Sequence, residues 1–370
     1  MRSDMTAFAV YRLPHQQQVT LVSQTTGKPQ EQPSCEALND QQGFVMAPFS
    51  ISDNTPLLLI RPDEVRTFAC GDMSMLRSDL EFAASKLPPS YVQTLSLLRP
   101  NSEQACYAAD FTRFHASLKS GRFSKLVLSR CSISILPPSP TSPLDLFQRA
   151  CTMYPRLFVA LVYTPQSGLW LTATPEILLE GDGCRWRTIA LAGTMKLKDN
   201  ELQGEGEHLT WSTKNIQEQR FVATYLRSCL EHFASDIREE GPRTVRAANL
   251  VHLRSDFTFT LFNNARVGTL LQALHPTPAV CGLPKEEAFR FILDNEHTPR
   301  QYYSGFMGPL NLITPSTHLY VSLRCMQITA THYHLYAGGG LLKDSVEEQE
   351  WQETEAKLET MRQCIATKKI

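Results

Sequence analysis

The sequence predicts one large α/β domain that contains much antiparallel sheet. Helix-like and strand-like segments are mixed along the chain without the strict strand–helix alternation of a parallel sheet. The 370 residues are enough to bury a large core. Hydrophobic residues make up 42% of the chain and charged residues 20%, a composition typical of a soluble globular protein.

Composition also argues against several functional classes. The formal net charge is -1, and Lys and Arg are not clustered, so no nucleic-acid surface is expected. No stretch approaches the roughly 18 continuous apolar residues of a membrane span, and the N-terminal residues MRSDMTAFAVYRLPHQQQ contain no long apolar run of the kind found in signal peptides. The ten cysteines form no CxxC pair, so we expect neither a zinc knuckle nor a disulfide framework. A cytoplasmic protein is the simplest expectation.

The first half of the chain predicts a mixture of strands and helices. Residues 1–100 carry short apolar runs between polar loops, which predict strands at AFAVYRL, GFVMAPF and PLLLIRP. Residues 102–121 show helical spacing and close on Gly121, as a helix with a glycine C-cap does. Residues 125–136 predict a strand, and a proline-rich turn then leads to a helix with Asp145 as its N-cap.

The second half predicts a meander followed by further helices and strands. Three strands, separated by glycine-containing turns, are expected at LFVALVYT, GLWLTATPEILLE and CRWRTIALAGTM. A long helix is predicted from Gln203 to Glu240. The remaining expected elements are a strand at ANLVHLRSDFTFTLF, two helices within TLLQALHPTPAVCGLPKEEAFRFILDN, strands at RQYYSGFMGPLNLI and HLYVSLRCMQITATHYHLYAGGG, and a final helix.

Residues 337–357 are the most informative stretch, because they combine a predicted glycine turn with an acidic helix. Glu350, Glu353 and Lys357 are spaced by three and four residues, which places them on one helical stripe. Two carboxylates, an ammonium and glycine amides could there converge on a small acidic ligand or hold a metal ion. The alternative is a solvated, salt-bridged terminal helix. The glycine cluster and an apolar face formed by Trp351, Leu358 and Met361 favour a docked, ligand-binding helix.

Three charged residues in apolar surroundings are further candidates. Lys125 begins an apolar strand, where its ammonium either reaches water or ends in a pocket that lowers its pKa enough for base catalysis. Glu176 follows Pro175 among residues that favour burial, so it is either a solvent-facing strand end or a protonated general acid. Arg324 is the single charge in an apolar strand and predicts a carboxylate partner from the protein or a ligand.

A helical glutamate is the candidate for a metal ligand. Glu218 lies four residues after Lys214, and an intrahelical salt bridge is the default expectation. The metal alternative needs a second carboxylate, for which Glu353 is the natural candidate, and Mg²⁺ typically takes one or two. His252 is expected to be a core histidine. The glycine run lacks a following GK[ST], and the helix after it is acidic, so nucleotide binding is not expected.

Taken together in chain order, ten segments resemble the chorismate-utilising enzymes, the family of isochorismate, salicylate, anthranilate and aminodeoxychorismate synthases. The resemblance runs from about Pro100 to the C-terminus and implies one domain in which two antiparallel sheets are sandwiched by helices. We therefore expect residues 1–100 to be the N-terminal part of the fold and 101–370 the chorismate-binding catalytic region. The segments are KLVLSR, TPEILLE, ALAGTMK, STKNIQEQ, LVHLRSD, LHPTPAVCGLPKEEA, RQYYSGFMG, LYVSLRCMQI, LYAGGGLL and EEQEWQETEAK.

Details within these segments favour isochorismate synthase among the branches. Lys125 resembles the lysine of the water-activating branches, and Ala192 stands where aminodeoxychorismate synthases place a nucleophilic lysine. LHPTPAVCG is similar to isochorismate synthases. The alternatives are a salicylate synthase and a non-catalytic chorismate-binding subunit. Asn215 and Gln219 depart from the acidic residue and the histidine of many relatives, which bears on metal affinity.

The resemblance also implies roles for individual residues. Lys125 would deprotonate a water that attacks C2 of chorismate, while Glu176 protonates the departing C4 hydroxyl. Mg²⁺ would anchor the ring carboxylate, held by Glu218 and Glu353 with Glu350 behind. The other expected contacts are Gly193, Thr194 and His252 at the ring carboxylate, and Arg324, Tyr303, Lys357 and the amides of Gly338 and Gly340 at the enolpyruvyl carboxylate. No obligatory protein partner is expected, and menaquinone synthesis is preferred over siderophore synthesis as the pathway.

Overall fold

The computed structural model describes residues 5–71, 73, 76–77, 100–137, 139–196, 210–247, 250–312 and 315–366. These residues form two antiparallel sheets of nine strands each. The first sheet has the order β14 (Gly282–Leu283), β7 (Lys125–Ile135), β18 (His332–Leu341), β17 (Cys325–Ile328), β9 (Gly168–Thr174), β8 (Phe158–Thr164), β1 (Ala7–Arg12), β2 (Gln18–Gln24) and β6 (Glu64–Ala69).

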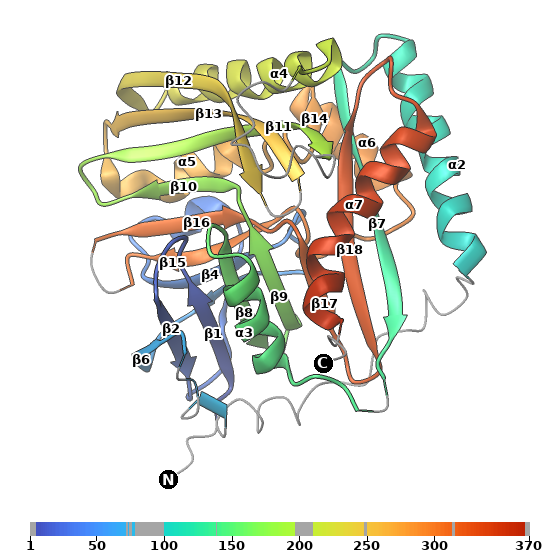
Figure 1. Ribbon diagram of the computed structural model, residues 1–370. Coiled ribbons are helices and arrows are strands. Elements are labelled where there is room, and N and C mark those ends of the chain that lie inside the picture. Colours follow the sequence, from blue (N-terminus) through green and yellow to red (C-terminus); the bar gives the residue numbers. More distant parts are fainter. Residues whose placement is uncertain are drawn as a thin grey trace.

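The second sheet contains the strands that the first does not. Its order is β12 (Ala234–Ala247), β13 (Leu250–Leu261), β11 (Trp186–Lys196), β10 (Ile177–Gly181), β16 (Thr317–Val321), β15 (Phe306–Leu310), β4 (Gly43–Ala47), β5 (Leu57–Ile60) and β3 (Gln30–Gln32). In Figure 1 its strands run across the view, whereas those of the first sheet run steeply from top to bottom.

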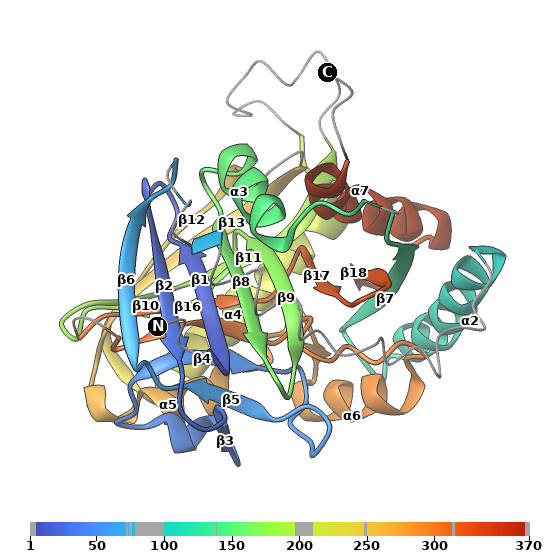
Figure 2. The same cartoon turned by 90° about the horizontal axis from the view of Figure 1, so that it is seen from below.

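Helices cover the outer faces of both sheets. Figure 1 shows α4 above β11–β13 and α7 in front of β18, and Figure 2 shows α2 beyond β7 at the edge of the first sheet. The α-helices are α2 (Pro100–Lys119), α3 (Pro143–Met153), α4 (Thr213–Leu230), α5 (Val267–Leu274), α6 (Lys285–Asn295) and α7 (Glu347–Ile365), and the short 3₁₀ turns are η1 (Cys35–Leu38) and η3 (Asn264–Arg266). None of the helices in the described residues is long and apolar enough to cross a membrane.

The core between the sheets makes the N-terminal strands part of the same domain. β1 pairs with β8 in the first sheet, and β4 pairs with β15 in the second. Between them lies a buried cluster drawn from both sheets, in which the rings of Phe158 and Tyr320 stack at 4.3 Å. The predicted fold, two antiparallel sheets sandwiched by helices, is therefore confirmed.

Several predicted elements are confirmed as well. The helix predicted at 102–121 is α2, and Gly121 follows it with φ +77°, a backbone conformation that suits glycine. The strand predicted at 125–136 is β7. The final helix docks as expected, with Leu358 and Met361 each 1% exposed. The ten cysteines are free thiols, most of them buried.

Three predicted elements are wrong in their extent. The helix expected to run to Glu240 ends at Leu230, and residues 234–247 form β12 because they pair with β13 over its whole length; residues 203–209 of that prediction lie outside the described residues. GLWLTATPEILLE is two strands, β9 and β10, which belong to different sheets, so the predicted meander is broken at Pro175. Helix α3 is capped by Ser142, whose side chain accepts a hydrogen bond from the Asp145 amide.

The predicted glycine turn is also wrong, because Gly338, Gly339 and Gly340 lie inside β18. Glycine is required there by crowding rather than by turn geometry. A Cβ on Gly338 would lie 2.7 Å from the Tyr303 hydroxyl, and one on Gly340 would lie 1.9 Å from Glu218 Oε1. The expectation that the backbone passes close to other groups is thus confirmed.

Candidate functional site

The site lies where two chain segments cross from one sheet to the other. Between β9 and β10 the chain passes through Pro175 and Glu176, and between β16 and β17 it passes through residues 322–324. The segments are tied together: the Thr174 hydroxyl donates to the Val321 carbonyl at 2.7 Å, and the Val321 amide donates to the Glu176 carbonyl at 2.9 Å. Glu176 and Arg324 are therefore held at the boundary between the sheets.

Arg324 does not lie within a strand, contrary to the prediction from VSLRCMQI. It immediately precedes β17, and its backbone has φ +45°, which non-glycine residues rarely adopt. Its carbonyl accepts from the Ala173 amide at 3.0 Å, which fixes this conformation. The left-handed backbone ends the preceding segment, and Arg324 is 7% exposed at the wall of a cavity.

This cavity brings together ten of the thirteen residues predicted for the site. Its volume is about 40 Å³, and its walls come from both sheets and from α4 and α7. The predicted residues that line it are Glu176, Gly193, Thr194, Glu218, His252, Tyr303, Arg324, Gly338, Gly340 and Lys357. The other three, Lys125, Glu350 and Glu353, lie immediately behind this wall.

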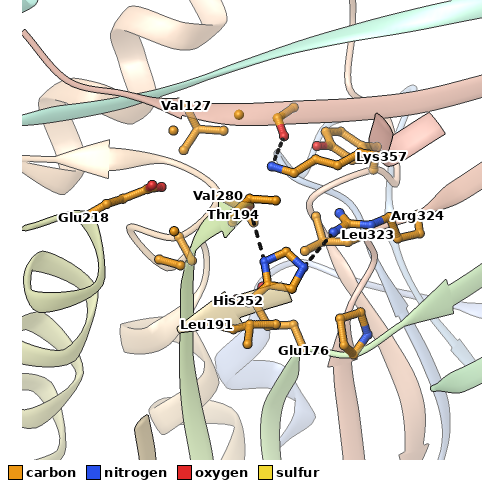
Figure 3. A pocket seen from close by; sticks show the side chains of 18 residues that line it. Val127, Glu176, Leu191, Thr194, Glu218, His252, Val280, Leu323, Arg324 and Lys357 are labelled. Carbon is orange, nitrogen blue, oxygen red and sulfur yellow. Dashed lines mark hydrogen bonds between the residues drawn. The ribbon is translucent and has the colours of Figure 1, made fainter. Parts of the chain in front are cut away.

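Charged groups face one another across the cavity. Figure 3 shows Glu218 on one side, Arg324 and Lys357 on the other, and His252 between them. The His252 ring has Nε2 3.3 Å from an Arg324 nitrogen and Nδ1 3.3 Å from the Thr194 hydroxyl. Burial and the Arg324 charge lower the pKa of His252 well below its ordinary value, so the ring is neutral. Because arginine can only donate, Nε2 accepts and Nδ1–H donates to Thr194.

A bulge in β11 presents Thr194 to the cavity. The register of β11 against β13 shifts between Ala192 and Thr194, and Gly193 there has φ +72°. A Cβ on Gly193 would lie 3.0 Å from the Asn215 carbonyl oxygen, so α4 also requires glycine at this position. The Asn215 side chain donates to the Thr194 carbonyl at 3.4 Å, a hydrogen bond that an ionised acid could not donate.

Gln219 secures α4 against the same bulge. It is 1% exposed, its carbonyl oxygen accepts from the Ala192 amide at 3.0 Å, and its amide group donates to the Ala190 carbonyl at 3.1 Å. The neighbouring residue on the helix is Glu218, which points into the cavity. Gln219 thus fixes the position of α4 that aims Glu218.

Glu176 is a buried carboxyl poised to hold a proton. Its exposure is 3%, and burial raises its pKa from the ordinary value to about 7, although the positive charges of Lys125, Arg324 and Lys357 act in the opposite direction. The prediction left a solvent-facing position open, and burial rules that out. A carboxyl with a pKa near neutrality can donate a proton at physiological pH.

Lys125 is fully buried and lies beside Glu218. Its Nζ is 3.0 Å from Glu218 Oε1, but in the described part of the chain this nitrogen makes no hydrogen bond of good geometry. The default expectation for Lys125, an ammonium that reaches water, is therefore wrong. The Lys125 and Lys214 charges lower the pKa of Glu218 in spite of burial, which acts the other way and is the largest single effect.

The acidic residues of α7 are paired with lysines. Lys357 Nζ donates to Glu353 Oε1 at 2.6 Å and to the Gly338 carbonyl at 2.9 Å, as expected for a stripe of this spacing. Lys214 pairs with Glu350 instead of forming the predicted intrahelical bridge with Glu218. The Oε2 atom of Glu350 is buried and lacks a hydrogen-bond donor among the described residues. Burial and the neighbouring Glu353 charge raise the pKa of Glu350.

These carboxylates fit a hard divalent cation. Glu350 Oε2 and Glu353 Oε1 each lie 3.5 Å from the point that a Cβ on Gly339 would occupy, so they face a common space that glycine keeps open. Glu218 lies beside the next residue, Gly340. An unsatisfied buried carboxylate oxygen beside a second carboxylate suits Mg²⁺, which prefers oxygen ligands. As they stand, no three His, Cys, Asp or Glu side chains in the described residues form a closed metal cluster.

The backbone of β18 also faces the cavity. Val127, opposite Gly340, donates its amide to the Cys281 carbonyl at 2.7 Å and accepts from Arg300 at 2.8 Å on the side away from β18. Gly340 and Gly338 are therefore non-hydrogen-bonded partners of β7, and their backbone groups point away from it. Pairing of β18 with β17 stops at Tyr336, so this edge borders the cavity.

The apolar part of the lining was not predicted from the sequence. Val127, Leu191, Val280 and Leu323 contribute to the wall, but nothing distinguishes them in the sequence from core residues of ordinary strands. A larger cavity of about 370 Å³ lies between residues 49–55 and α6, where the charged groups Glu296 and Arg300 are paired with each other. It lacks the unpaired, converging charges of the site described above.

Comparison with known proteins supports the resemblance seen in the motifs. Residues 63–366 match the family model of the chorismate binding enzymes. Isochorismate synthase EntC of Escherichia coli strain K12 is 29% identical over 262 residues, which cover 70% of this chain and 66% of the relative. The salicylate biosynthesis isochorismate synthase of Pseudomonas aeruginosa is 31% identical over 258 residues, 68% of this chain and 52% of the relative. The chain thus spans just under two thirds of the first relative and about half of the second.

Solved structures share the fold over nearly the whole chain. The putative 2,3-dihydroxybenzoate-specific isochorismate synthase DhbC of Bacillus anthracis matches with a TM-score of 0.77 and 22% identity, covering 98% of this chain and 96% of that one. MenF, the menaquinone-specific isochorismate synthase of Escherichia coli, matches with a TM-score of 0.76 and 23% identity, covering 98% and 90%. At these identities the likeness shows the fold.

Proposed function

The chain belongs to the chorismate binding enzyme family, and from this premise we propose that it is an isochorismate synthase, which converts chorismate to isochorismate with Mg²⁺. The observation that carries the proposal is the buried Glu176 carboxyl, with a pKa of about 7, at the cavity wall, together with the buried Lys125 side chain behind Gly340 of that wall. Exchange of one hydroxyl group for another requires such a proton donor and proton acceptor.

Two carboxylates of the substrate need partners of opposite charge. Arg324 has no carboxylate within ion-pair distance in the described residues, although it is buried at the cavity wall. Together with Tyr303, Lys357 and the amides of Gly338 and Gly340, it would bind the enolpyruvyl carboxylate. His252, Thr194 and Gly193 would lie beside the ring carboxylate.

The acidic residues would hold Mg²⁺. Glu218 and Glu353 are the proposed ligands, with Glu350 behind them; the bound ion supplies positive charge that neutralises the ring carboxylate and orients it. The resemblance implies an acidic residue at position 215 in several relatives, and this chain has asparagine there. Since Asn215 holds the Thr194 carbonyl instead, its contribution is to the shape of the bulge.

The reaction is one of balanced proton transfer. Lys125 takes a proton from a water whose oxygen forms a bond to C2, the ring double bonds shift, and the C4–oxygen bond breaks. Glu176 gives its proton to the departing hydroxyl, which leaves as water. For this step the Lys125 amine must be uncharged and must turn from Glu218 toward the ring, and apolar residues such as Val127 and Leu323 would limit access of bulk water.

Incubation of the purified protein with chorismate and Mg²⁺ tests the proposal. Isochorismate is expected as the product, and Lys125→Ala and Glu176→Gln are each expected to lower turnover by at least ~100-fold, the usual worth of a general acid or base, while chorismate still binds. Near-normal turnover by either variant would contradict the assigned roles. Accumulation of fluorescent salicylate would instead indicate a salicylate synthase, and binding without turnover by the wild type a non-catalytic subunit.

The pathway and location belong to the proposal as well. We place the enzyme in the cytoplasm, with menaquinone synthesis as the consumer of isochorismate and catecholate siderophore synthesis as the alternative. Deletion of the gene followed by quinone and siderophore analysis distinguishes them. Loss of menaquinone alone is expected, and loss of siderophore alone would overturn the preference.

A further inference from the structure

The three carboxylates of the acidic site are each paired with a different lysine. The donors come from three separate elements, so the pairing is not a consequence of helical spacing alone. The pairs are Lys125 of β7 with Glu218, Lys214 of α4 with Glu350, and Lys357 of α7 with Glu353. Three ammonium groups thus balance the three negative charges that a divalent cation would bind.

Lys214 differs from the other two lysines. Lys125 and Lys357 have roles in the proposed reaction, whereas Lys214 does not line the cavity and contacts Glu350 from behind the wall. The Lys214 side chain is 25% exposed, while that of Glu350 is 2% exposed. The Lys214 side chain can therefore move into solvent when a cation binds Glu350, whereas the Glu350 side chain cannot.

The position of Lys214 on its helix is unfavourable for a positive charge. It is the second residue of α4, close to the positive end of the helix dipole. The helix dipole thus does not stabilise an ammonium there, and within the described residues the ion pair that Lys214 makes is with the Glu350 carboxylate of another helix. Among the described residues Glu350 Oε2 accepts no hydrogen bond, and it lies, like Glu353 Oε1, 3.5 Å from the point that a Cβ on Gly339 would occupy.

We propose that Lys214 competes with the divalent cation for Glu350 and so sets the affinity of the acidic site for Mg²⁺. The inference rests on the proposed metal site and deepens it. An ammonium and a divalent cation that share the same buried carboxylates repel each other, and each binds more weakly in the presence of the other. Binding of the cation then requires the ammonium of Lys214 to turn away from Glu350 into solvent.

Titration calorimetry with magnesium chloride alone, without chorismate, tests the inference. Lys214→Met removes the charge and retains much of the side-chain volume, and Mg²⁺ is expected to bind this variant about tenfold more tightly than the wild type, the order expected for loss of one nearby charge. Arg227→Met is the matched control, because it removes a cation from the same helix that pairs with an exposed acid, Glu231, at 3.5 Å. The control is expected to leave the dissociation constant unchanged.

Thermal unfolding gives a second readout. Lys214→Met leaves Glu350 buried without its partner, so the variant is expected to unfold at a lower temperature than the wild type in the presence of a chelator. Addition of Mg²⁺ is expected to raise the unfolding temperature of the variant by more than that of the wild type. If the variant does not fold in chelator, Lys214→Gln, which can still donate a hydrogen bond to Glu350, replaces it. A tighter dissociation constant is expected for this variant too.

The double variant with Glu350→Gln identifies the carboxylate concerned. In the Glu350→Gln background, Lys214→Met is expected to have a clearly smaller effect on Mg²⁺ binding than in the wild-type background. An unchanged or weaker affinity of Lys214→Met alone would overturn the competition, as would an equal effect in both backgrounds. If the wild type binds no Mg²⁺, the metal site of the proposed function fails, an outcome distinct from failure of the role of Lys214.

Discussion

At the scale of single residues, the environment separates two groups that carry the chemistry. Glu176 is buried near positive charges, and the pKa of its carboxyl is raised toward neutrality because the effect of burial outweighs that of those charges. Glu218 is similarly buried, but its pKa is lowered because Lys125 and Lys214 lie close to it. Two glutamates thus take different protonation states at the same pH, one suited to proton donation and one to binding a cation.

The pH dependence of turnover follows from Glu176. Its pKa of about 7 leaves it protonated below neutrality, so we expect turnover at saturating chorismate to fall as the pH rises above about 7. Burial of the neutral form also stabilises the fold at low pH, and this contribution is lost as the pH rises through the same value. A profile of the turnover number between pH 6 and 9 measures the effect.

The Glu176→Asp variant serves as the comparison, because it keeps a carboxyl but shifts its position. In this variant the turnover number is still expected to fall at alkaline pH, but the fall should occur at a different pH from that of the wild type. If the wild-type turnover were flat across neutrality, Glu176 would not be the group that donates the proton.

At the scale of elements, β18 is the strand around which the site is built. Its three glycines allow α7 to pack on one face and Glu218 with Lys125 to approach the other, and its free edge turns backbone groups toward the cavity. The two sheet crossovers beside it place Glu176 and Arg324. The strand β18 and the two crossovers therefore position several of the polar groups.

A methyl group on β18 tests this arrangement. Gly340→Ala would place a Cβ 1.9 Å from Glu218 Oε1 and 3.0 Å from Lys125 Cε, so these two side chains must move. Because both are side-chain ends, we expect the protein to fold but turnover to fall by about 10–100-fold, as displacement of a reacting group by ~1 Å does. Steady-state kinetics with chorismate measures the loss.

Gly71→Ala is the control for that substitution. Among the described residues, a Cβ on Gly71 would meet no atom within 4 Å, and the residue lacks a left-handed φ. Its turnover should match the wild type. Equal kinetics for the two alanine variants would mean that the crowding at Gly340 has no catalytic consequence.

At the scale of the whole molecule, the site depends on how the two sheets pack. Strands from residues 7–69 belong to both sheets, and their apolar faces fill the space between them. The cavity lies at the boundary of these sheets, so its shape is set by a core to which almost every part of the chain contributes. The stacked rings of Phe158 and Tyr320 join the sheets directly.

Removal of one of these rings should destabilise the entire domain. Phe158 is fully buried, and Phe158→Ala is expected to lower the free energy of unfolding by about 3–5 kcal/mol through lost burial and a cavity. Chemical denaturation followed by circular dichroism measures it. Phe262→Ala, at a residue 66% exposed, should change the free energy by less than about 0.5 kcal/mol. Equal losses in the two variants would contradict the role assigned to the inter-sheet core.

The sequence by itself determined the family and the antiparallel α/β class, because ordered motifs and local residue spacing can be recognised without knowing which distant segments touch. It also predicted thirteen site residues, ten of which line one cavity. Lys357 with Glu353 is a case of such local spacing, since four residues of helix are enough to place the pair. Assignment of catalytic roles to these residues stays a prediction.

Only the tertiary structure decided where strands end, which lysine meets which glutamate and why the glycines are there. The break at Pro175 is a change of sheet, which no local pattern encodes, and residues 234–247 become a strand because β13 offers them a partner. Lys214 reaches Glu350, 136 residues away, rather than its helical neighbour Glu218. Such pairings depend on packing between distant segments, and it is this packing that turns scattered charges into one site.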